Sequence, residues 1–354
     1  MLTSLPAPGG AAVTGDLGSR VVSWAVRDRL LPPEERKHRW WPFRRLNEWT
    51  IPGLLIALAG LVIYAWQRSP YFLTVNNIVN IGENISIRGL MAIGLTVLLI
   101  SGGLDLSIAA VAAFSGMFAA MMINAGVNGA VAGLVALACA ATMGLINAVI
   151  IVRLRVNPII ATLGTLLLFR GLAFVVSGGD NIVIGVNAWS HFGRGEELGV
   201  KVTLWVFAAV LVGGMWFMRH SFIGNNLYAI GGNAAACRNV GMKVDRIRMW
   251  SYVAMAILSG IAGIALMSRG GTAQPAAFEG AELEIITAVF LGGVALTGGR
   301  GSLLGTFLGL IIIGVITNSF VLTNVPIYWQ MVVRGIILIL AVSIDSIRRG
   351  GGYR

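Results

Sequence analysis

Apolar runs of membrane-spanning length recur along most of this chain, and they restrict its fold more than any other feature. The runs that we expect to cross a membrane cover residues 51–67, 84–101, 106–124, 130–152, 158–176, 202–218, 248–268, 283–297, 301–322 and 327–345. A transmembrane helix needs about 20 apolar residues at a rise of about 1.5 Å per residue. Several runs are shorter, so we expect tilted, broken or partly spanning helices. The sequence predicts an all-α, polytopic transmembrane bundle of about ten spans.

Charged residues are scarce and lie mostly between the apolar runs. They make up 12% of the chain, whereas soluble domains carry about 25%. The formal net charge of +11 is also typical of nucleic-acid-binding proteins, but the basic residues form no stripe on a soluble fold. Basic loops between apolar runs are what membrane topology produces. We therefore expect a lipid membrane around this chain and no nucleic-acid partner.

The basic residues also predict the orientation of the chain. With ten spans and an inner amino terminus, most Lys and Arg residues fall in inner segments. The outer segments then hold only Arg68, Arg194, Lys201 and Arg269. Because short cytoplasmic loops carry the excess of Lys and Arg, both termini and the loop 219–248 are predicted to be cytoplasmic.

Three regions follow from this pattern. Residues 1–48 form a basic, proline-containing arm that we expect to be cytoplasmic and partly disordered. Residues 49–346 form the transmembrane domain, and residues 347–354 form a short cytoplasmic tail. No signal peptide is expected, because no short apolar core precedes a small-residue cleavage site.

A glycine-rich break separates the second and third predicted spans. Gly102 and Gly103 can unwind a helix, and the exposed backbone must then face protein or a water-filled cavity. Asp105 is an ionisable group at this depth, where carboxylates mark functional sites or pair with buried bases. Asp105 could instead cap the next helix through the amides that follow it, and both roles can hold together. Gly102, Gly103, Asp105 and Ser107 are our first candidates for a translocation path.

Further polar residues could line the same path. Six of them cluster at the start of the second span: Asn76, Asn77, Asn80, Glu83, Asn84 and Arg88. They could contact a hydroxyl-rich solute or be ordinary interfacial groups. After the seventh span, a second break contains Gln274, and Glu279, Glu282 and Glu284 follow and open the eighth span. These glutamates suit the helix dipole, or they form an outer gate or a contact for a binding protein. We take Asn84, Gln274 and Glu282 as further path candidates.

The remaining ionisable residues form no catalytic or metal-binding constellation. The three histidines, His38, His191 and His220, are scattered along the chain, and none stands at metal-ligand spacing with another ligand. No glycine-rich loop ending in Gly-Lys-Ser/Thr is present, so we expect no ATP on this chain. Arg170 and Arg334 fall within spans, and we expect their heads to extend to the interface from positions near helix ends. The sequence thus predicts neither an enzyme nor a bound cofactor or metal.

The longest polar interruption after the amino-terminal arm covers residues 229–248, with the sequence AIGGNAAACRNVGMKVDRIR. It predicts a short helix of small residues, followed by a glycine and a basic segment. A cytoplasmic partner could bind to such a helix. The candidate contact residues are Asn233, Ala234, Ala235, Ala236, Arg238 and Gly241.

Residues 98–118 and 290–309 share a pattern of apolar run, glycine-rich break and second apolar run. Transporters often carry internal repeats whose broken helices line the substrate path. Chance similarity between glycine-rich membrane segments is the alternative.

Several longer motifs point to one family. They are SGGLDLSIAAVAAFSG at 101–116, NPIIATLGTLLLFRGLAFVVSGG at 157–179, YAIGGNAAACRNVGMKVDRIR at 228–248, AQPAAFEGAELEIITAVFLGGVALTGGRGSLLGTFLG at 273–309 and IYWQMVVRGIILILAV at 327–342. Through them, residues 51–345 resemble the membrane permeases of ATP-binding-cassette importers for monosaccharides of the ribose, xylose, arabinose and galactose type.

The resemblance implies a homodimeric permease in the bacterial cytoplasmic (inner) membrane, a periplasmic sugar-binding protein and a cytoplasmic ATPase that holds the ATP. It also implies that residues 228–248 contain the coupling helix. In the family a Glu precedes two alanines, and a glycine follows five residues after the second. Here Ala234 stands in the place of the Glu, before Ala235, Ala236 and Gly241. The missing carboxylate puts a salt bridge to the ATPase in doubt, but not the docking.

The resemblance therefore predicts a permease that translocates a monosaccharide or related small polar solute, driven by ATP on another subunit. Pentoses, hexoses, polyols and modified sugars all fit this expectation. An ion-coupled secondary transporter with Asp105 as the ion site is the alternative, although intramembrane carboxylates are few. A membrane-embedded enzyme would need clustered His, Asp or Glu at one depth.

Overall fold

The computed structural model describes residues 44–185 and 189–348. The chain divides into two compact units, Met1–Glu48 and Trp49–Arg354, and the second unit is described below. The expected disorder of the arm falls on residues outside the described ranges, and so does most of the predicted tail.

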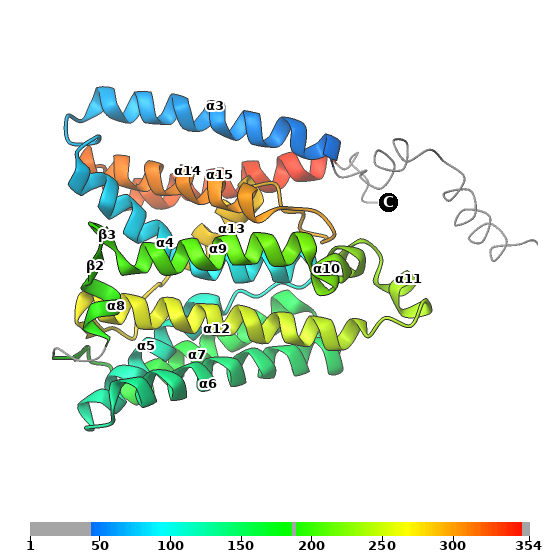
Figure 1. Cartoon of the computed structure of the whole chain (residues 1–354), viewed down its shortest axis with the longest axis horizontal. Coiled ribbons are helices and arrows are strands. Elements are labelled where there is room, and N and C mark those ends of the chain that lie inside the picture. The colour runs from blue at the N-terminus through cyan, green and yellow to red at the C-terminus, as the bar shows by residue number, and fades with distance from the viewer. Residues whose placement is uncertain (1–43, 186–188, 349–354) are drawn as a thin grey trace, which may run out of the picture. The chain divides into compact units, whose positions relative to one another are not determined.

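Helices make up most of the described chain (Figure 1). The α-helices are α3 (Arg44–Arg68), α4 (Val75–Ile100), α5 (Ile108–Asn124), α6 (Gly129–Ala148), α7 (Pro158–Ser177), α8 (Ser190–Arg194), α9 (Val202–His220), α10 (Phe222–Gly232), α11 (Ala234–Asn239), α12 (Val244–Gly270), α13 (Ala281–Leu291), α14 (Leu303–Leu322) and α15 (Ile327–Arg348). A π-helical turn, η1 (Val149–Arg153), extends α6. Two short antiparallel pairs join β1 (Ile182–Val183) to β4 (Thr272–Ala273) and β2 (Glu196–Glu197) to β3 (Val200–Lys201).

Seven helices of the described residues are long and apolar enough to cross a membrane. They are Ile51–Arg68, Val75–Ile100, Gly129–Arg153, Pro158–Ser177, Val202–His220, Val244–Gly270 and Leu303–Leu322. Helix α5 and the stretch Ile327–Ser343 are shorter apolar helices. The predicted helical, polytopic membrane fold is confirmed, whereas the count of ten spans and the side of the termini stay predictions.

One predicted span ends earlier than expected. We expected a span over 283–297, but α13 ends at Leu291. Gly292 and Gly293 follow, and Gly293 has a φ of +85°, which a continuing right-handed helix does not allow. The chain then runs without helix to Ser302, the residue that caps α14.

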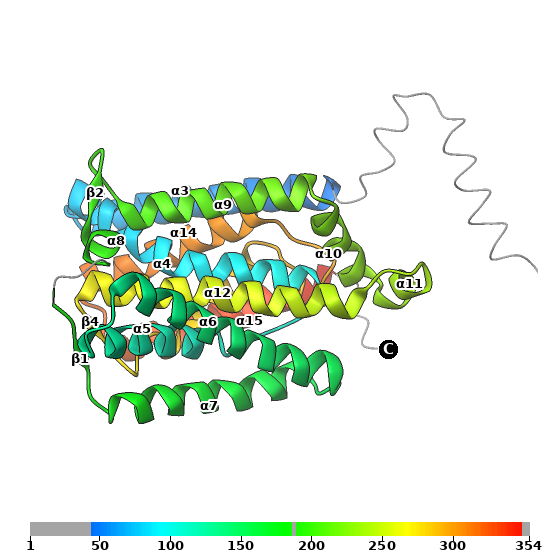
Figure 2. The same cartoon turned by 60° about the horizontal axis from the view of Figure 1, so that its bottom comes forward.

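Helices α4 and α12 form the centre of the second unit. Within an apolar 18-residue stretch of each helix, 83% of the residues are buried in α4 and 67% in α12, against 11% in α3. Helix α12 lies between α4 on one side and α5 and α6 on the other (Figure 2). Small residues allow this close packing: a Cβ atom on Gly263 would lie 1.9 Å from the carbonyl oxygen of Ala112 in α5.

Local capping residues set several helix ends. The side chains of Asn128 and Asn157 accept hydrogen bonds from backbone N–H groups at the starts of α6 and α7, both at 2.9 Å, as N-cap residues do. Pro158 follows as the first residue of α7, a position that needs no N–H. Gly178 and Gly271 end α7 and α12 in the left-handed conformation. Polar and glycine residues between the apolar runs therefore place the helices in sequence.

Candidate functional site

The predicted break between the second and third spans is a buried non-helical segment, residues 101–107. Helix α4 ends at Ile100, and Gly102 follows with a φ of +82°. Asp105 is fully buried. Its Oδ1 accepts hydrogen bonds from the backbone N–H and the hydroxyl of Ser107, at 2.7 and 2.6 Å. Its Oδ2 accepts one from Nδ2 of Asn147 in α6, at 2.7 Å.

This geometry supports the structural alternative for Asp105. The carboxylate binds the N–H of Ser107, the residue that precedes α5, as short polar side chains do in turns that start a helix. Its role as an ion site stays a prediction. Asn147 also donates to the hydroxyl of Ser107, at 2.9 Å. Sequence analysis missed Asn147, although an amide inside an apolar run was a signal for a buried polar contact.

Four glycines from three segments meet beside this break. We call Gly102, Gly231, Gly298 and Gly299 the glycine junction. A Cβ atom on Gly231 would lie 1.9 Å from the carbonyl oxygen of Ile100 and 2.3 Å from the nitrogen of Gly299, and one on Gly298 would lie 2.8 Å from Cα of Gly102. The N–H of Gly299 donates to the same Ile100 oxygen at 2.9 Å. No larger residue fits at Gly231 or Gly298 unless the backbone moves.

The glycine junction joins the end of α4, the end of α10 and the loop 292–302 between α13 and α14. The two segments with a shared pattern, 98–118 and 290–309, both fold as a helix, a glycine-rich break and a second helix. Their breaks touch through Gly102 and Gly298. Sequence analysis identified the pattern but not the contact.

Two polar side chains of α12 hold the same break from the other side. Nε of Arg248 donates to the carbonyl oxygen of Ser101 at 3.0 Å. The hydroxyl of Tyr252, a fully buried residue, donates to the carbonyl oxygen of Leu104 at 3.2 Å. These bonds satisfy backbone carbonyls that the broken helix leaves without partners.

The predicted short helix is present as α11, which projects at one end of the second unit (Figures 1 and 2). Asn233 caps it, because its side chain accepts a hydrogen bond from the N–H of Ala236 at 3.0 Å. A small apolar cluster of Ile230, Cys237 and Val244, with Ala234 packed against it, anchors the helix. Ala234 therefore faces inward, toward this cluster.

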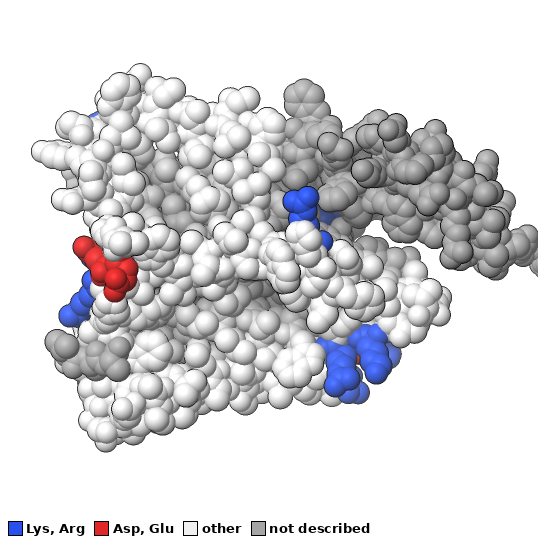
Figure 3. All heavy atoms as spheres, in the orientation of Figure 1, with Lys and Arg blue, Asp and Glu red and all other residues white. Residues whose placement is uncertain are grey.

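The other face of α11 is open. Ala235, Ala236 and Val240 are exposed, and Gly241 follows with a φ of +81°. We call the exposed residues Asn233, Ala235, Ala236, Arg238, Val240 and Gly241 the α11 surface. Arg238 pairs with Asp245 at 2.7 Å. On the face drawn in Figure 3, most basic side chains lie at the end that carries α10 and α11, and acidic ones gather at the opposite end near β2.

A cavity of about 450 Å³ opens toward the end opposite α11, between α4, α5, α12, α13 and α15. We call it the outer cavity, because the predicted orientation of the chain places this end outside. Its polar and charged lining consists of Asn84, Arg88, Thr272, Gln274, Glu279, Glu284 and Arg334.

An ion cluster lies in the wall of the outer cavity. Glu284 is only 6% exposed, and its two carboxylate oxygens lie 3.5 Å from Nε of Arg88 and 3.5 Å from Nη1 of Arg334. A neighbouring pair joins Arg269 to Glu83 at 2.8 Å. Residues from α4, α12, α13 and α15 are thus held together by charge, as buried ionisable groups require partners.

Arg170 and Arg334 contradict the expectation that their heads extend to the interface. Nη1 of Arg170 donates to the carbonyl oxygens of Pro275 and Ala277, at 2.9 and 2.6 Å. Arg334 pairs with Glu284. Both guanidinium groups find partners inside the protein: the loop after α12 supplies the acceptors of Arg170, and Glu284 of α13 pairs with Arg334.

The predicted path residues do not form one site. Asn84 and Gln274 line the outer cavity, whereas Gly102, Gly103, Asp105 and Ser107 form the buried break beside the glycine junction. Glu282 is outside the cavity lining and interacts electrostatically with Arg170. Sequence analysis missed the central role of Glu284, although a carboxylate at the start of a span, with arginines in two others, was a signal for pairing.

Comparisons with known proteins point in one direction. A family model described as "Branched-chain amino acid transport system / permease component" matches residues 77–342. The ribose import permease protein of Escherichia coli (strain K12) is 37% identical over 296 residues, which cover 82% of this chain and 92% of the relative. That of Bacillus subtilis (strain 168) is 39% identical over 298 residues, 83% of this chain and 92% of the relative. The L-arabinose ABC transporter permease protein of Azospirillum brasilense is 36% identical over 299 residues, 83% and 87%. No solved structure matches.

Proposed function

We propose that this chain, which belongs to the family of permease components of the branched-chain amino acid transport system type, is the permease of an ATP-driven importer for a monosaccharide or related small polar solute. Its similarity to ribose and arabinose permeases confirms the resemblance found in the sequence. The chain is a multi-pass protein of the bacterial cytoplasmic membrane. The proposal assigns ATP hydrolysis to a separate cytoplasmic ATPase, solute delivery to a periplasmic binding protein, and the active form to a homodimer.

The contact between α10 and the two broken helices carries this proposal. Gly232, the last residue of α10, is followed by Asn233, the cap of α11. Gly231 lies against Ile100 at the end of α4 and against Gly299. A force applied to α11 by a partner therefore reaches both glycine breaks over a short, tightly packed path, as an externally driven conformational change requires.

The outer cavity supplies a place where the solute would first contact the permease. Its charged lining contains Arg88 and Arg334, with Glu279 and Glu284 opposite in sign. The charges balance, and the amides of Asn84 and Gln274 offer both donors and acceptors. This lining suits an uncharged, hydroxyl-rich solute better than an anion or a cation.

In the proposed cycle the permease alternates between an outward-open and an inward-open state. The binding protein delivers the solute to the outer face, and ATP binding closes the ATPase pair against the two α11 surfaces. Each partner must bind the two states with different affinity, because otherwise its binding would shift neither state. The glycine junction is where we expect the backbone to transmit the change.

The α11 surface provides the direct test. We expect Ala235→Arg to leave the amount of permease in the membrane unchanged, because Ala235 is exposed. It should lower solute uptake and solute-stimulated ATP hydrolysis about 30-fold or more, since a large charged side chain in a docking interface acts like the loss of a hot spot. Both rates are measured in proteoliposomes that contain the permease, its ATPase and its binding protein.

Ala235→Ser is the matched control and should keep near-normal rates. Gly241→Arg should also abolish coupling, but the φ of +81° at Gly241 adds backbone strain to any substitution there. Gly241→Ala measures that strain without the bulk. Normal uptake by both arginine variants would contradict the docking assignment.

The ion-coupled alternative makes a different prediction. The purified chain alone in liposomes should accumulate no solute under a proton or sodium gradient, because Asp105 is held by Ser107 and Asn147. Uptake of labelled ribose and arabinose is measured with each gradient imposed. Accumulation that Asp105→Asn abolishes would establish the alternative and overturn the proposal of an ATP-driven permease.

A further inference from the structure

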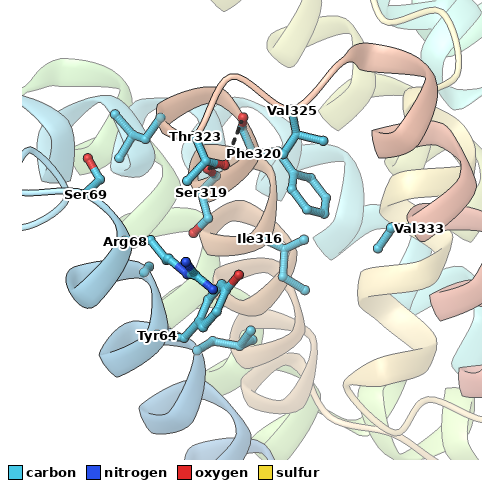
Figure 4. Close-up of a pocket in the computed structure, with 12 residues that line it drawn as sticks. Tyr64, Arg68, Ser69, Ile316, Ser319, Phe320, Thr323, Val325 and Val333 are labelled. Carbon is cyan, nitrogen blue, oxygen red and sulfur yellow. Dashed lines mark hydrogen bonds between the residues drawn. The ribbon is translucent and has the colours of Figure 1, made fainter.

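A second cavity, of about 250 Å³, lies between α3, α14 and the first turns of α15 (Figure 4). We call it the α3 crevice. Its lining consists of Leu61, Tyr64, Ala65, Arg68, Ser69, Ile316, Ser319, Phe320, Leu322, Thr323, Val325 and Val333. It belongs to neither the glycine junction nor the outer cavity, and the proposed transport cycle does not use it.

The polar side chains of the α3 crevice lie toward one end, among the apolar residues Leu322 and Val325, and its deeper part is apolar. The charged and hydroxyl side chains in its lining are Tyr64, Arg68, Ser69, Ser319 and Thr323, which lie at or near the ends of α3 and α14. The apolar part reaches Leu61 on α3 and Ile316 on α14, about 10 Å deeper along each helix at about 1.5 Å per residue. One leaflet of the hydrocarbon core is about 15 Å thick. The crevice therefore extends through about two thirds of the thickness of one leaflet.

Arg68 at the polar end has no carboxylate partner among the described residues. Its guanidinium lies over the ring of Tyr64, 5.4 Å from the centroid. In Figure 4 both side chains point from α3 toward α14, with Ser319 near Arg68. A cation at the end of a membrane span, with an aromatic ring beside it, is suited to a lipid phosphate.

The attachment of α3 leaves room for such a ligand. The carboxyl-terminal part of α3, together with Phe72 of the following segment, contacts α14 through a small apolar cluster of Ala65, Phe72 and Val315. An earlier part of α3 contacts α14 through a cluster of Leu54, Leu308 and Ile312. Only 11% of the residues in its span are buried. An acyl chain in the α3 crevice would add apolar contact between α3 and α14, which protein side chains supply sparsely.

We propose that the α3 crevice binds one anionic phospholipid, with its phosphate at Arg68 and an acyl chain along Leu61, Ile316 and Val333. A sugar would leave its hydroxyls without partners against the apolar wall, and free phosphate would leave that wall unfilled. The bound lipid acts as a structural ligand that fastens α3 to the rest of the bundle.

The experiment uses the full chain, purified in detergent and stripped of lipid. Adding phosphatidylglycerol should raise the Tm by about 4 °C, as a ligand specific to the folded state does, whereas phosphatidylcholine and inorganic phosphate should not. Native mass spectrometry should show one retained phosphatidylglycerol per chain. An equal shift with inorganic phosphate or phosphatidylcholine, or no shift with phosphatidylglycerol, would overturn the proposal.

Variants separate this site from general effects of lipid. Arg68→Gln should lose the shift and the retained lipid, Arg68→Lys should keep both, and Val333→Phe should block the apolar end. Arg219→Gln, which removes an exposed charge at the far end of α9, is the matched control and should behave as the wild type. Retention of phosphatidylglycerol by both Arg68→Gln and Val333→Phe would show that the lipid binds elsewhere.

Discussion

Replacing Gly231 by alanine should abolish solute uptake, whereas the same replacement at Gly232 should leave uptake near the wild-type level. The added Cβ on Gly231 would lie 1.9 Å from the carbonyl oxygen of Ile100 and 2.3 Å from the nitrogen of Gly299. These neighbours are backbone atoms, so no side chain can rotate away. Such overpacking costs about 1–3 kcal/mol or more, and relief would require the glycine junction to separate.

Gly232→Ala is the matched control for Gly231→Ala. Gly232 follows Gly231 in α10, and a Cβ there would meet nothing within 4 Å. Gly231 and Gly232 are the last two residues of α10, so each substitution gains less helix propensity than the roughly 1 kcal/mol of a helix interior, and the difference between the variants isolates the contact. Uptake per unit of membrane-inserted permease and Tm are the measurements. Equal uptake by the two variants would show that the junction does not carry the coupling motion.

Glu284→Gln should lower uptake about ten-fold or more. Glu284 is the shared partner of Arg88 and Arg334, and the amide would leave two neighbouring cations without their anion. Breaking a buried pair costs about 3–5 kcal/mol, but the arginine side chains are 31% and 28% exposed, so solvent screening reduces the cost to about 1–3 kcal/mol. The loss should reach transport because the cluster joins α4, α13 and α15 at the outer cavity.

Glu279→Gln is the matched control for this prediction. Glu279 lines the same cavity, is exposed, and makes no ion pair within 4.0 Å among the described residues. It should change uptake less than two-fold or so. Uptake is measured in the complete proteoliposome system, together with the Tm of each variant. If the two variants transported equally well, the ion cluster would have no role beyond ordinary surface charge.

The fold was predicted in class but not in every boundary. Long apolar runs predicted helices because a backbone in lipid must satisfy its own hydrogen bonds. The prediction over 283–297 erred because apolar composition continues past Leu291 while the backbone leaves the helix at Gly292 and Gly293. Apolar composition indicates that a segment lies in lipid or in the protein interior, but it does not show where the backbone leaves the helix. The backbone conformation at the glycines decides that point.

The candidate site was predicted unevenly. Helix α11 and its cap Asn233 lie where the small-residue pattern indicated, since capping is a local interaction within a few residues. The partners of Arg170 and Arg334 were not foreseen, because they are distant in sequence. Pro275 and Ala277 lie 105 and 107 residues after Arg170, and Glu284 lies on a different helix from Arg334. A single sequence indicates that charges within spans need partners, but it does not show which distant residues supply them.

The amino-acid order alone determined that this is a helical membrane protein with glycine-rich breaks and a short basic helix between spans, because the requirement to bury or expose each segment acts locally. Only the tertiary structure decided that the breaks at Gly102 and Gly298 touch each other and Gly231, and that Glu284 pairs with two arginines from other helices. These contacts depend on how helices pack, and packing is a property of side-chain shape summed over the whole bundle.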